Sequence, residues 1–472
     1  MALSNTTIGT LMASLDRNII IIALPSIAYE LHASLLTLVW IAIGYWVVTA
    51  SVLLTFGRLA DMFGRVKLYN MGFAVFTVGS ALCSISNTGE QLIVFRVVQA
   101  LGAAFLFSNS AAIITDVFPE NERGRALGLN QVSIVVGSVI GLALGGFLTS
   151  YLGWRSIFWI NIPIGIFATF WAYSKLKELG TIKKEKIDWL GNTIFSGGIL
   201  LLLVGITFGS FQVVDQLRIC LVILGGSALL TLFYFVEKKV SKPMFDFSLF
   251  KINLFTISNI AIFLNALARG AFTLVMVFYL QGPSMRLGSL DAGIYLIPVS
   301  LALAAFAPIS GWLYDKYNFT LIAPAGLLIS AAGFFMLSSV GATMSFFDSV
   351  LPLVLVGAGM GIFASPNRTI IMNSVPSFRR GVAAGISTTL VMTGSAFSIG
   401  LVFLVFTQIM PLHETQNIFS GSFDALNIDT MKVDAFVTSL QAIFLISAIL
   451  MVVSTIPFIM KLCYERYQKI NK

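Results

Sequence analysis

The chain has 472 residues, of which 57% are hydrophobic and only 11% are charged, and its mean hydropathy is +0.92. Soluble domains carry about 25% charged residues, so this composition excludes an ordinary soluble domain and makes lipid the solvent for most of the chain. The net charge of +8 suggests an anionic partner such as nucleic acid, an interpretation that depends on where the basic residues lie.

Apolar runs long enough to cross a bilayer recur along the whole chain. A bilayer core of about 30 Å requires about 20 apolar residues per helix, and on that basis we predict fourteen transmembrane helices. In chain order they cover residues 7–29, 36–56, 69–87, 91–114, 128–150, 157–174, 190–210, 218–236, 253–280, 291–313, 321–340, 348–373, 384–409 and 435–460. The predicted fold class is an all-α polytopic membrane protein.

Basic residues concentrate in alternate loops between these helices. When both termini are placed in the cytoplasm, 21 of the 29 Lys and Arg residues fall on the cytoplasmic side and 4 on the outer side, namely Arg155, Arg218, Arg286 and Lys432. Acidic residues divide into 11 inside and 9 outside, as expected when positive charge alone sets topology. We therefore predict a multi-pass protein with cytoplasmic termini, and the charge gives no support to nucleic-acid binding.

Other residue types predict neither a metal site nor a nucleotide site. Cys83, Cys220 and Cys463 are too scattered for a disulfide framework or a ligand cluster, and His32 and His413 lie far apart in predicted outer loops. The sequence has no Gly-rich phosphate loop ending in Lys-Ser or Lys-Thr, so we expect neither ATP nor any other cofactor. With no basic leader, the first apolar segment is expected to be retained as a span.

Two pairs of motifs indicate an internal duplication. The charged turn Gly57–Lys67 (GRLADMFGRVK) has a fainter copy at Gly311–Lys316 (GWLYDK), 254 residues later. The run Arg123–Gly128 is similar to Arg380–Gly385, 257 residues later, and we assign both runs to loops. Parallel six-helix repeats of this kind are a transporter pattern.

Gly102 and Gly359 share the spacing of 257 residues, which strengthens the case for two six-helix halves. Twelve of the fourteen predicted helices are then accounted for. We predict an N-terminal bundle at 1–187, two inserted transmembrane helices with flanking cytoplasmic loops at 188–252, and a C-terminal bundle at 253–472.

Several of these motifs resemble those of a known family. Gly57–Lys67 is similar to the loop signature of the major facilitator superfamily, and Arg96–Gly102 (RVVQALG) resembles its fourth-helix signature. Ser14–Pro25 and Gly153–Gly165 resemble the 14-helix drug:proton antiporters of the EmrB/QacA type, and the match continues at 279–298 in the second half.

This resemblance implies the major facilitator fold, with two six-helix bundles plus two inserted helices, in the plasma membrane of a prokaryote. It also implies a protein that is not an enzyme, that exchanges protons for a small organic molecule by alternating access, and that uses the proton gradient as its energy source. The oligomeric state cannot be read from the sequence, and a monomer is our expectation. The chain departs from the family pattern at Leu142, where proline is usual, and at Arg17, Asn18 and Ile21. These departures weaken the case for generic multidrug export.

Asp16 is the only acidic residue that we place inside a span. An intramembrane carboxylate is costly and is by default a functional candidate, and its protonation responds to burial and to nearby cations. We therefore predict that Asp16 carries the coupled proton, which requires a cavity beside it. A structural ion pair with Arg17 or with a neighbouring helix is the alternative.

Arg96 lies in the outer part of the fourth helix, and the resemblance implies a role for it in proton coupling. Counted from the outer ends at Glu30 and Glu90, the depths of Asp16 and Arg96 differ by about 12 Å. We therefore expect these two side chains to share a polar cavity without direct contact. A purely structural role for Arg96 is the alternative.

Further polar residues inside spans are candidates for the substrate cavity. On an α-helix, the Arg17 side chain points about 100° away from that of Asp16. Two interpretations of Arg17 stay open: it lines the cavity, or it extends toward the lipid headgroups. The full candidate set is Arg17, Asn18, Gln99, Asn109, Asn265 and Arg269.

The turn Gly57–Lys67 is predicted to act as a conformational gate. Gly57 and Gly64 permit close approach of the helices. Asp61 is expected to face the positive end of the third helix. Arg58 or Arg65 is expected to pair with Asp61 or with a loop carboxylate. The alternative is a plain basic cytoplasmic turn.

The second copy of this turn keeps Gly311 and Asp315 but has Asn318 and Phe319 where the first copy has its downstream glycine and arginine. We therefore expect the first copy to matter more for conformational cycling.

Small residues recur in the fifth predicted helix at Gly137, Gly141, Gly145 and Gly146. Such residues let membrane helices pack closely, which is sufficient to explain them. The family resemblance implies in addition that this helix forms a sliding surface between the halves.

These observations lead to one hypothesis and two rivals. The first is a proton-coupled exporter of hydrophobic or amphipathic organic compounds, the second a proton-coupled transporter of a dedicated metabolite such as an organic acid. A membrane-embedded enzyme or sensor would need an intramembrane catalytic cluster or a sizeable soluble domain, and we see neither in the sequence. The charge of the substrate stays open, because Asp16 favours a cation while Arg17, Arg96 and Arg269 favour an anion or a neutral molecule.

Overall fold

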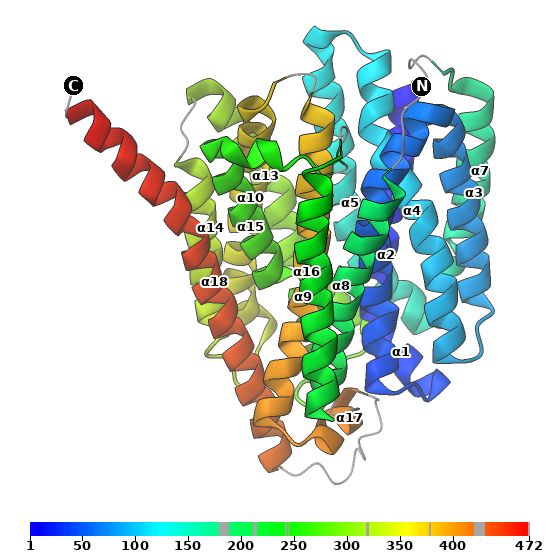
Figure 1. Ribbon diagram of the computed structural model, residues 1–472. Helices are drawn as coiled ribbons and strands as arrows, with labels where there is room; N and C mark the ends of the chain where they lie inside the picture. The colour runs from blue at the N-terminus through cyan, green and yellow to red at the C-terminus, as the bar shows by residue number, and fades with distance from the viewer. Residues whose placement is uncertain are drawn as a thin grey trace.

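The computed structural model describes residues 1–178, 188–210, 215–240, 243, 245–317, 321–376, 379–419 and 430–470, and these residues form helices and loops without a strand. The helices run side by side, and the N-terminus and the end of the last helix lie at one face, here named the terminal face (Figure 1). The elements are α1 (Ala2–Leu31), α2 (Leu35–Phe63), α3 (Arg65–Ser84), α4 (Gly89–Val117), α5 (Glu120–Leu152), α6 (Ser156–Trp159), α7 (Asn161–Lys175), α8 (Trp189–Ser210), α9 (Gln216–Glu237), η1 (Phe247–Lys251), α10 (Asn253–Arg269), α11 (Phe272–Gln281), α12 (Ser289–Tyr295), α13 (Ile297–Tyr317), α14 (Ile322–Leu337), α15 (Phe346–Ser374), α16 (Arg380–Ile409), α17 (Leu412–Phe419) and α18 (Thr430–Ile470).

The predicted fold class is confirmed, with a helix count close to the predicted fourteen. Within the described residues, 13 helices are long and apolar enough to cross a membrane, and α14 is a shorter apolar helix of 16 residues. Three of the 13 are interrupted, since α6 leads into α7, α10 into α11, and α12 into α13. The short helices η1 and α17 were not predicted.

Helix starts are encoded locally by hydroxyl side chains. Ser34, Thr88 and Ser345 each accept a hydrogen bond from the backbone N–H three residues later, at the starts of α2, α4 and α15. Such caps satisfy one of the backbone donors left free at a helix N-terminus. Gly64 separates α2 from α3 with a φ of 103°, a conformation that favours glycine.

The two sets of helices pack in parallel ways. In the first set, α1 packs on α5, α2 and α3 on α4, and α7 on α3. In the second set, α10 packs on α16, α13 and α14 on α15, and α18 on α14. These contacts correspond one to one along the chain, as a duplication requires. We refer to α1–α7 as the first bundle and to α10–α18 as the second.

The repeated runs Arg123–Gly128 and Arg380–Gly385 lie at the starts of helices, which corrects their assignment to loops. α5 begins at Glu120 and α16 at Arg380. These runs carry charged residues because they lie at a helix end, outside the apolar part of the helix. The predicted apolar spans therefore begin later than the helices do. Their equivalent positions agree with the duplication.

Gly102 and Gly359 each allow two neighbouring helices of their bundle to pack closely. A methyl group added at Gly102 would lie 2.4 Å from the backbone nitrogen of Phe76 on α3, and one added at Gly359 would lie 2.3 Å from that of Ser330 on α14. Both distances are far below a van der Waals contact, so only glycine allows these helix pairs to approach so closely.

The variant Gly102→Ala is therefore expected to lower the thermal unfolding midpoint clearly, because α3 and α4 must separate to admit the methyl group. Gly44→Ala is the matched control, since a methyl group there meets nothing within 4 Å and alanine favours a helix over glycine by about 1 kcal/mol. Thermal unfolding of the detergent-purified variants measures both. Equal midpoints would contradict the packing role of Gly102.

The glycines of α5 divide between two neighbours. Methyl groups added at Gly137, Gly141 and Gly145 would meet backbone oxygens of α1 at 2.7 Å, 2.8 Å and 3.1 Å. A methyl group at Gly146 would lie 2.5 Å from the carbonyl oxygen of Ser289 on α12. Three of the four thus serve packing within the first bundle, and only Gly146 faces the second.

The two bundles touch at both ends of the helices. Away from the terminal face, Gln281 Nε2 donates to the carbonyl of Ile22 at 3.0 Å, and the backbone N–H of Leu290 donates to Ser150 Oγ at 3.1 Å. Nearer the terminal face, α2 packs on α16, where a methyl group added at Gly385 would overlap Leu54. α8 lies against both α2 and α16, and α9 packs on α8.

Candidate functional site

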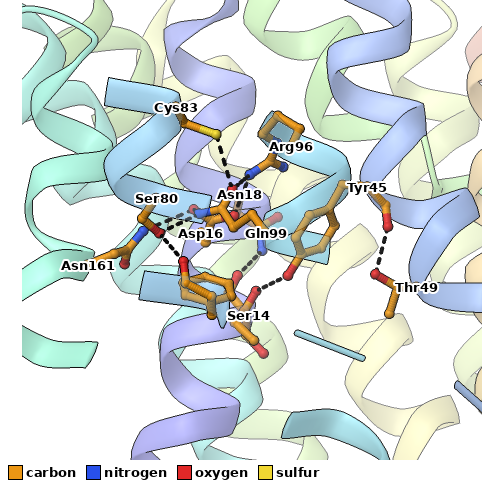
Figure 2. A network of polar contacts seen from close by, with 12 residues as sticks. Ser14, Asp16, Asn18, Tyr45, Thr49, Ser80, Cys83, Arg96, Gln99 and Asn161 are labelled. Carbon is orange, nitrogen blue, oxygen red and sulfur yellow. Dashed lines mark hydrogen bonds and ion pairs between the residues drawn. The ribbon is translucent and has the colours of Figure 1, made fainter. Parts of the chain in front are cut away.

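Asp16 is held in a closed polar network inside the first bundle (Figure 2). Its side chain is 0% exposed, and that of Arg96 is 1% exposed. Arg96 Nη1 donates to Asp16 Oδ2 at 2.5 Å, while Gln99 Nε2 and Asn161 Nδ2 donate to Asp16 Oδ1 at 2.8 Å and 3.0 Å. The carboxylate therefore has three donors, from α4 and α7.

A second layer of side chains holds these donors in place. Arg96 Nη1 also donates to Gln99 Oε1 at 2.6 Å, and Gln99 Nε2 donates to Ser80 Oγ at 2.8 Å. The guanidinium of Arg96 lies over the Tyr45 ring, 4.5 Å from its centroid, which is a cation–π contact.

Sequence reasoning missed Ser80, Tyr45 and Asn161 as members of the network. Asn161 lies inside the motif Gly153–Gly165, which carried the family resemblance, and an amide in so apolar a stretch was an available signal. Ser80 and Tyr45 gave no comparable signal, because hydroxyl side chains are common in membrane helices.

The direct contact of Asp16 with Arg96 corrects the expectation that they share a cavity without touching. The depth estimate took Glu30 and Glu90 as level. Instead, Arg155 contacts both the Glu30 carboxylate and the carbonyl of Ser86, so the end of α1 lies near Ser86, four residues before Glu90. The long arginine side chain covers the remaining distance.

The same network bears on the proposed proton role of Asp16. The sequence interpretation required a cavity beside this carboxylate, whereas here the carboxylate is fully buried between α1, α4 and α7. Arg17 and Asn18, next along α1, are only half-buried. In this structure Asp16 is therefore not accessible to solvent.

Arg17 and Arg269 lie in different bundles, and each contacts an uncharged side chain. The Arg17 guanidinium lies over the ring of Trp46, 4.7 Å from its centroid. Arg269 Nε donates to Asn265 Oδ1 at 2.9 Å, and Asn265 Nδ2 contacts Met451 Sδ at 3.4 Å. Both arginines are half-buried.

The side chains of Asn18 and Asn109 contact neither Asp16 and its partners nor the two arginines Arg17 and Arg269. Asn18 Nδ2 donates to the carbonyl of Ser14 at 3.1 Å, and Asn109 Nδ2 to that of Phe105 at 2.8 Å. Both amides thus bond to the preceding turn of their own helix. The Oδ1 atom of buried Asn109 has no hydrogen-bond partner among the described residues.

The Gly57–Lys67 turn is tied together by Arg65. Arg65 Nε donates to Asp61 Oδ1 at 2.8 Å, and Arg65 Nη1 to Asp116 Oδ1 at 2.7 Å. The ends of α2, α3 and α4 are therefore joined through a single side chain at the terminal face. Gly57 borders α4, where an added methyl group would lie 4.0 Å from Ser108 Cβ.

The carboxylate at the start of α3 is Glu178, not Asp61 as expected. Glu178 accepts hydrogen bonds from the backbone N–H groups of Arg65 and Val66, at 3.1 Å and 2.9 Å. The expectation was wrong because Asp61 is paired with the Arg65 side chain. The segment after α7 instead passes the start of α3, where the Glu178 carboxylate binds the positive end of that helix. Arg58 reaches the carbonyl of Pro243, which follows α9.

The second copy of the turn has fewer ties. A methyl group added at Gly311 would lie 2.5 Å from Ser365 Oγ, so this glycine faces α15. Asp315 is exposed and makes no hydrogen bond or ion pair with the described part of the chain. Asn318 and Phe319 lie outside the described residues.

Comparison with known proteins decides the family. The description "Major Facilitator Superfamily" applies to a family pattern that matches residues 6–399. The chain belongs to the major facilitator superfamily. Its many apolar helices make it an integral, multi-pass membrane protein, and its relatives in the superfamily are transporters and not enzymes.

Two relatives at just above 30% identity cover most of both sequences. The uncharacterized transporter YebQ of Escherichia coli is 31% identical over 86% of this chain and 89% of its own length. The riboflavin transporter RibZ of Clostridioides difficile is 32% identical over 84% and 85%. Multidrug resistance protein 3 of Bacillus subtilis is 28% identical over 88% and 80%.

A solved structure shows the same fold. The bacterial homologue of the human lysosomal transporter Spinster, in an inward-facing and unoccupied conformation, superposes with a TM-score of 0.66. The match covers 97% of this chain and 96% of the other at 16% identity.

Within the described residues, no group of three or more His, Cys, Asp or Glu side chains is placed to hold a metal ion.

Proposed function

We propose that this protein is a proton-coupled antiporter that exports hydrophobic or amphipathic organic compounds by alternating access of its two bundles. The observation that carries the coupling part is the Asp16–Arg96 pair, a carboxylate and a cation that are both buried among membrane-spanning helices. Intramembrane ionisable groups commonly mark proton pathways in transporters. Multidrug resistance protein 3, a relative over most of the chain, supports the export of organic compounds.

The proposed cycle uses the Asp16–Arg96 pair as a two-state element. In the closed state Arg96, Gln99 and Asn161 stabilise the ionised carboxylate. When the bundles rock, opening of these contacts would leave Asp16 without its cation, and a proton would then neutralise it. Return to the closed state would release the proton, so that one bundle movement accompanies each proton transfer.

We further propose that the chain is of the 14-helix drug:proton antiporter type, with its terminal face in the cytoplasm. The subtype rests on α8 and α9, which lie between the bundles in sequence and pack on each other and against α2 and α16. The orientation rests on the excess of Lys and Arg in loops on the side of the termini. We place the protein in a prokaryotic plasma membrane, because the three relatives named above come from bacteria.

Reconstituted protein tests the coupling. The purified protein is reconstituted in liposomes and a pH gradient is imposed. The gradient is expected to drive uptake or release of a dye together with movement of protons. Asp16→Asn is expected to abolish the dye flux that the gradient drives. Asp315→Asn removes an exposed carboxylate and serves as the matched control. Flux that responds to the gradient equally in wild type and Asp16→Asn would remove Asp16 from the mechanism, and flux that ignores the gradient would refute coupling altogether.

A dedicated metabolite is the alternative substrate, and one relative favours it. The riboflavin transporter RibZ is as similar to this chain as the other relatives above and has a single named substrate. Riboflavin flux in the same liposomes distinguishes the two: saturable transport of riboflavin, with none of several unrelated dyes, would favour the dedicated transporter.

A further inference from the structure

Gln281 joins the two bundles on the face that lies away from the terminal face, here named the opposite face. Its Nε2 atom donates to the carbonyl oxygen of Ile22 on α1 at 3.0 Å, and its Oε1 atom accepts from Ser289 Oγ on α12 at 3.1 Å. The side chain is half-buried. A single amide thus connects the first bundle with two helices of the second.

The position of this amide is fixed within the second bundle. Gln281 is the last residue of α11, and two residues earlier the Tyr279 hydroxyl donates to the carbonyl oxygen of Gly341 at 3.0 Å. The turn after α11 folds back on it, since the backbone N–H of Leu287 donates to the carbonyl oxygen of Leu280 at 2.8 Å. The amide therefore moves with its own bundle, and separation of the bundles on this face would break its bond to α1.

The helices α5 and α12 meet on the same face through their backbones. The N–H of Leu290 donates to Ser150 Oγ at 3.1 Å. A methyl group added at Gly146 would lie 2.5 Å from the carbonyl oxygen of Ser289, so glycine allows this close approach and has no side chain that interlocks with the other helix. Hydrogen bonds between neutral groups exchange with water at a small net cost. A contact of this kind can therefore open and close reversibly.

We propose that Gln281 is a latch that holds the two bundles together on the opposite face, with Ser289 orienting its amide and Ser150 supporting the neighbouring contact. This inference rests on the proposed alternating access and names the contact that must break before the opposite face opens. Loss of the amide shifts the population toward the state that is open on this face, because only the closed state makes the bond to Ile22.

A distance measurement between spin labels tests the latch. Asn87→Cys and Thr343→Cys place labels at exposed positions just before α4 and α15, the equivalent helices of the two bundles, in a chain whose three native cysteines are replaced by serine. Pulsed electron paramagnetic resonance of the full chain in lipid nanodiscs gives the ratio of long to short distances. We expect Gln281→Leu to raise this ratio about threefold to tenfold.

Two further variants separate the latch from general loosening of the fold. Gln441→Leu is the matched control, because Gln441 is also half-buried and its Nε2 donates to the carbonyl oxygen of Val340 at 2.7 Å, but within the second bundle. It should leave the distances unchanged. Gly146→Ala keeps the Gln281 amide and adds a methyl group between α5 and α12, so it should also raise the ratio.

The outcomes separate this inference from the proposed function, since the measurement needs neither a proton gradient nor a substrate. Distances that stay the same in Gln281→Leu would overturn the latch, as would an equal shift in Gln441→Leu, while gradient-driven flux in liposomes would still support the antiporter. Conversely, a shift confined to Gln281→Leu and Gly146→Ala, in a protein without gradient-driven flux, would support the latch and refute the proton coupling.

Discussion

Arg96→Met is expected to destabilise the folded protein by about 3–5 kcal/mol, because it leaves the Asp16 carboxylate buried without its cation. The double variant Asp16→Leu with Arg96→Met is expected to recover most of this loss, since replacing a buried ion pair by apolar residues is often neutral or stabilising. Titration of the purified variants with denaturing detergent, followed by circular dichroism, measures both free energies of unfolding.

Transport should separate from stability in the same double variant. It is expected to be folded but to show no gradient-driven flux in liposomes, because the carboxylate that binds the proton and the arginine that pairs with it are both absent. A double variant that is as unstable as Arg96→Met would show that the cost lies in packing and not in the unpaired charge. Gradient-driven flux in the stable double variant would contradict a coupling role for the pair.

Asp61→Ala is expected to slow turnover about threefold to fivefold, whereas Asp315→Ala should change it less than about twofold. Asp61 shares Arg65 with Asp116 and so helps to join α2, α3 and α4, and a partly exposed ion pair of this kind contributes up to about 1 kcal/mol. Asp315 is exposed and makes no such contact with the described residues.

Initial rates of flux in liposomes, normalised to the amount of reconstituted protein, compare the two alanine variants directly. Arg65→Ala should resemble Asp61→Ala or exceed it, since it removes the cation common to both carboxylates. If Asp61→Ala and Asp315→Ala slow turnover equally, the gate would not be asymmetric between the two copies of the turn.

Hydropathy alone was enough to predict the helical fold, because the length of an apolar run is a direct measure of whether a helix can cross a bilayer. The motif spacings also anticipated the equivalent packing of Gly102 and Gly359, since duplicated helices keep their close contacts. Helix ends were less accurate, as at α5, where charged residues in the first turns continue the helix beyond the apolar span.

The candidate site was predicted in its residues but not in its contacts. Asp16, Arg96 and Gln99 stood out because polar side chains are rare in spans, but their relative depth depends on where each helix ends, which the sequence does not show. The role of Glu178 was missed for a related reason. It lies beyond the end of α7 and reaches α3 only through the three-dimensional path of the chain.

Asp16 and Arg17 are adjacent residues of α1 that face different surroundings. Asp16 points into the first bundle toward Arg96, while Arg17 points toward Trp46. Substitutions on the Arg17 side can therefore be made without touching the residues around Asp16. Under the proposed function, such a division would let new substrate ranges evolve, or be engineered, while proton coupling is preserved.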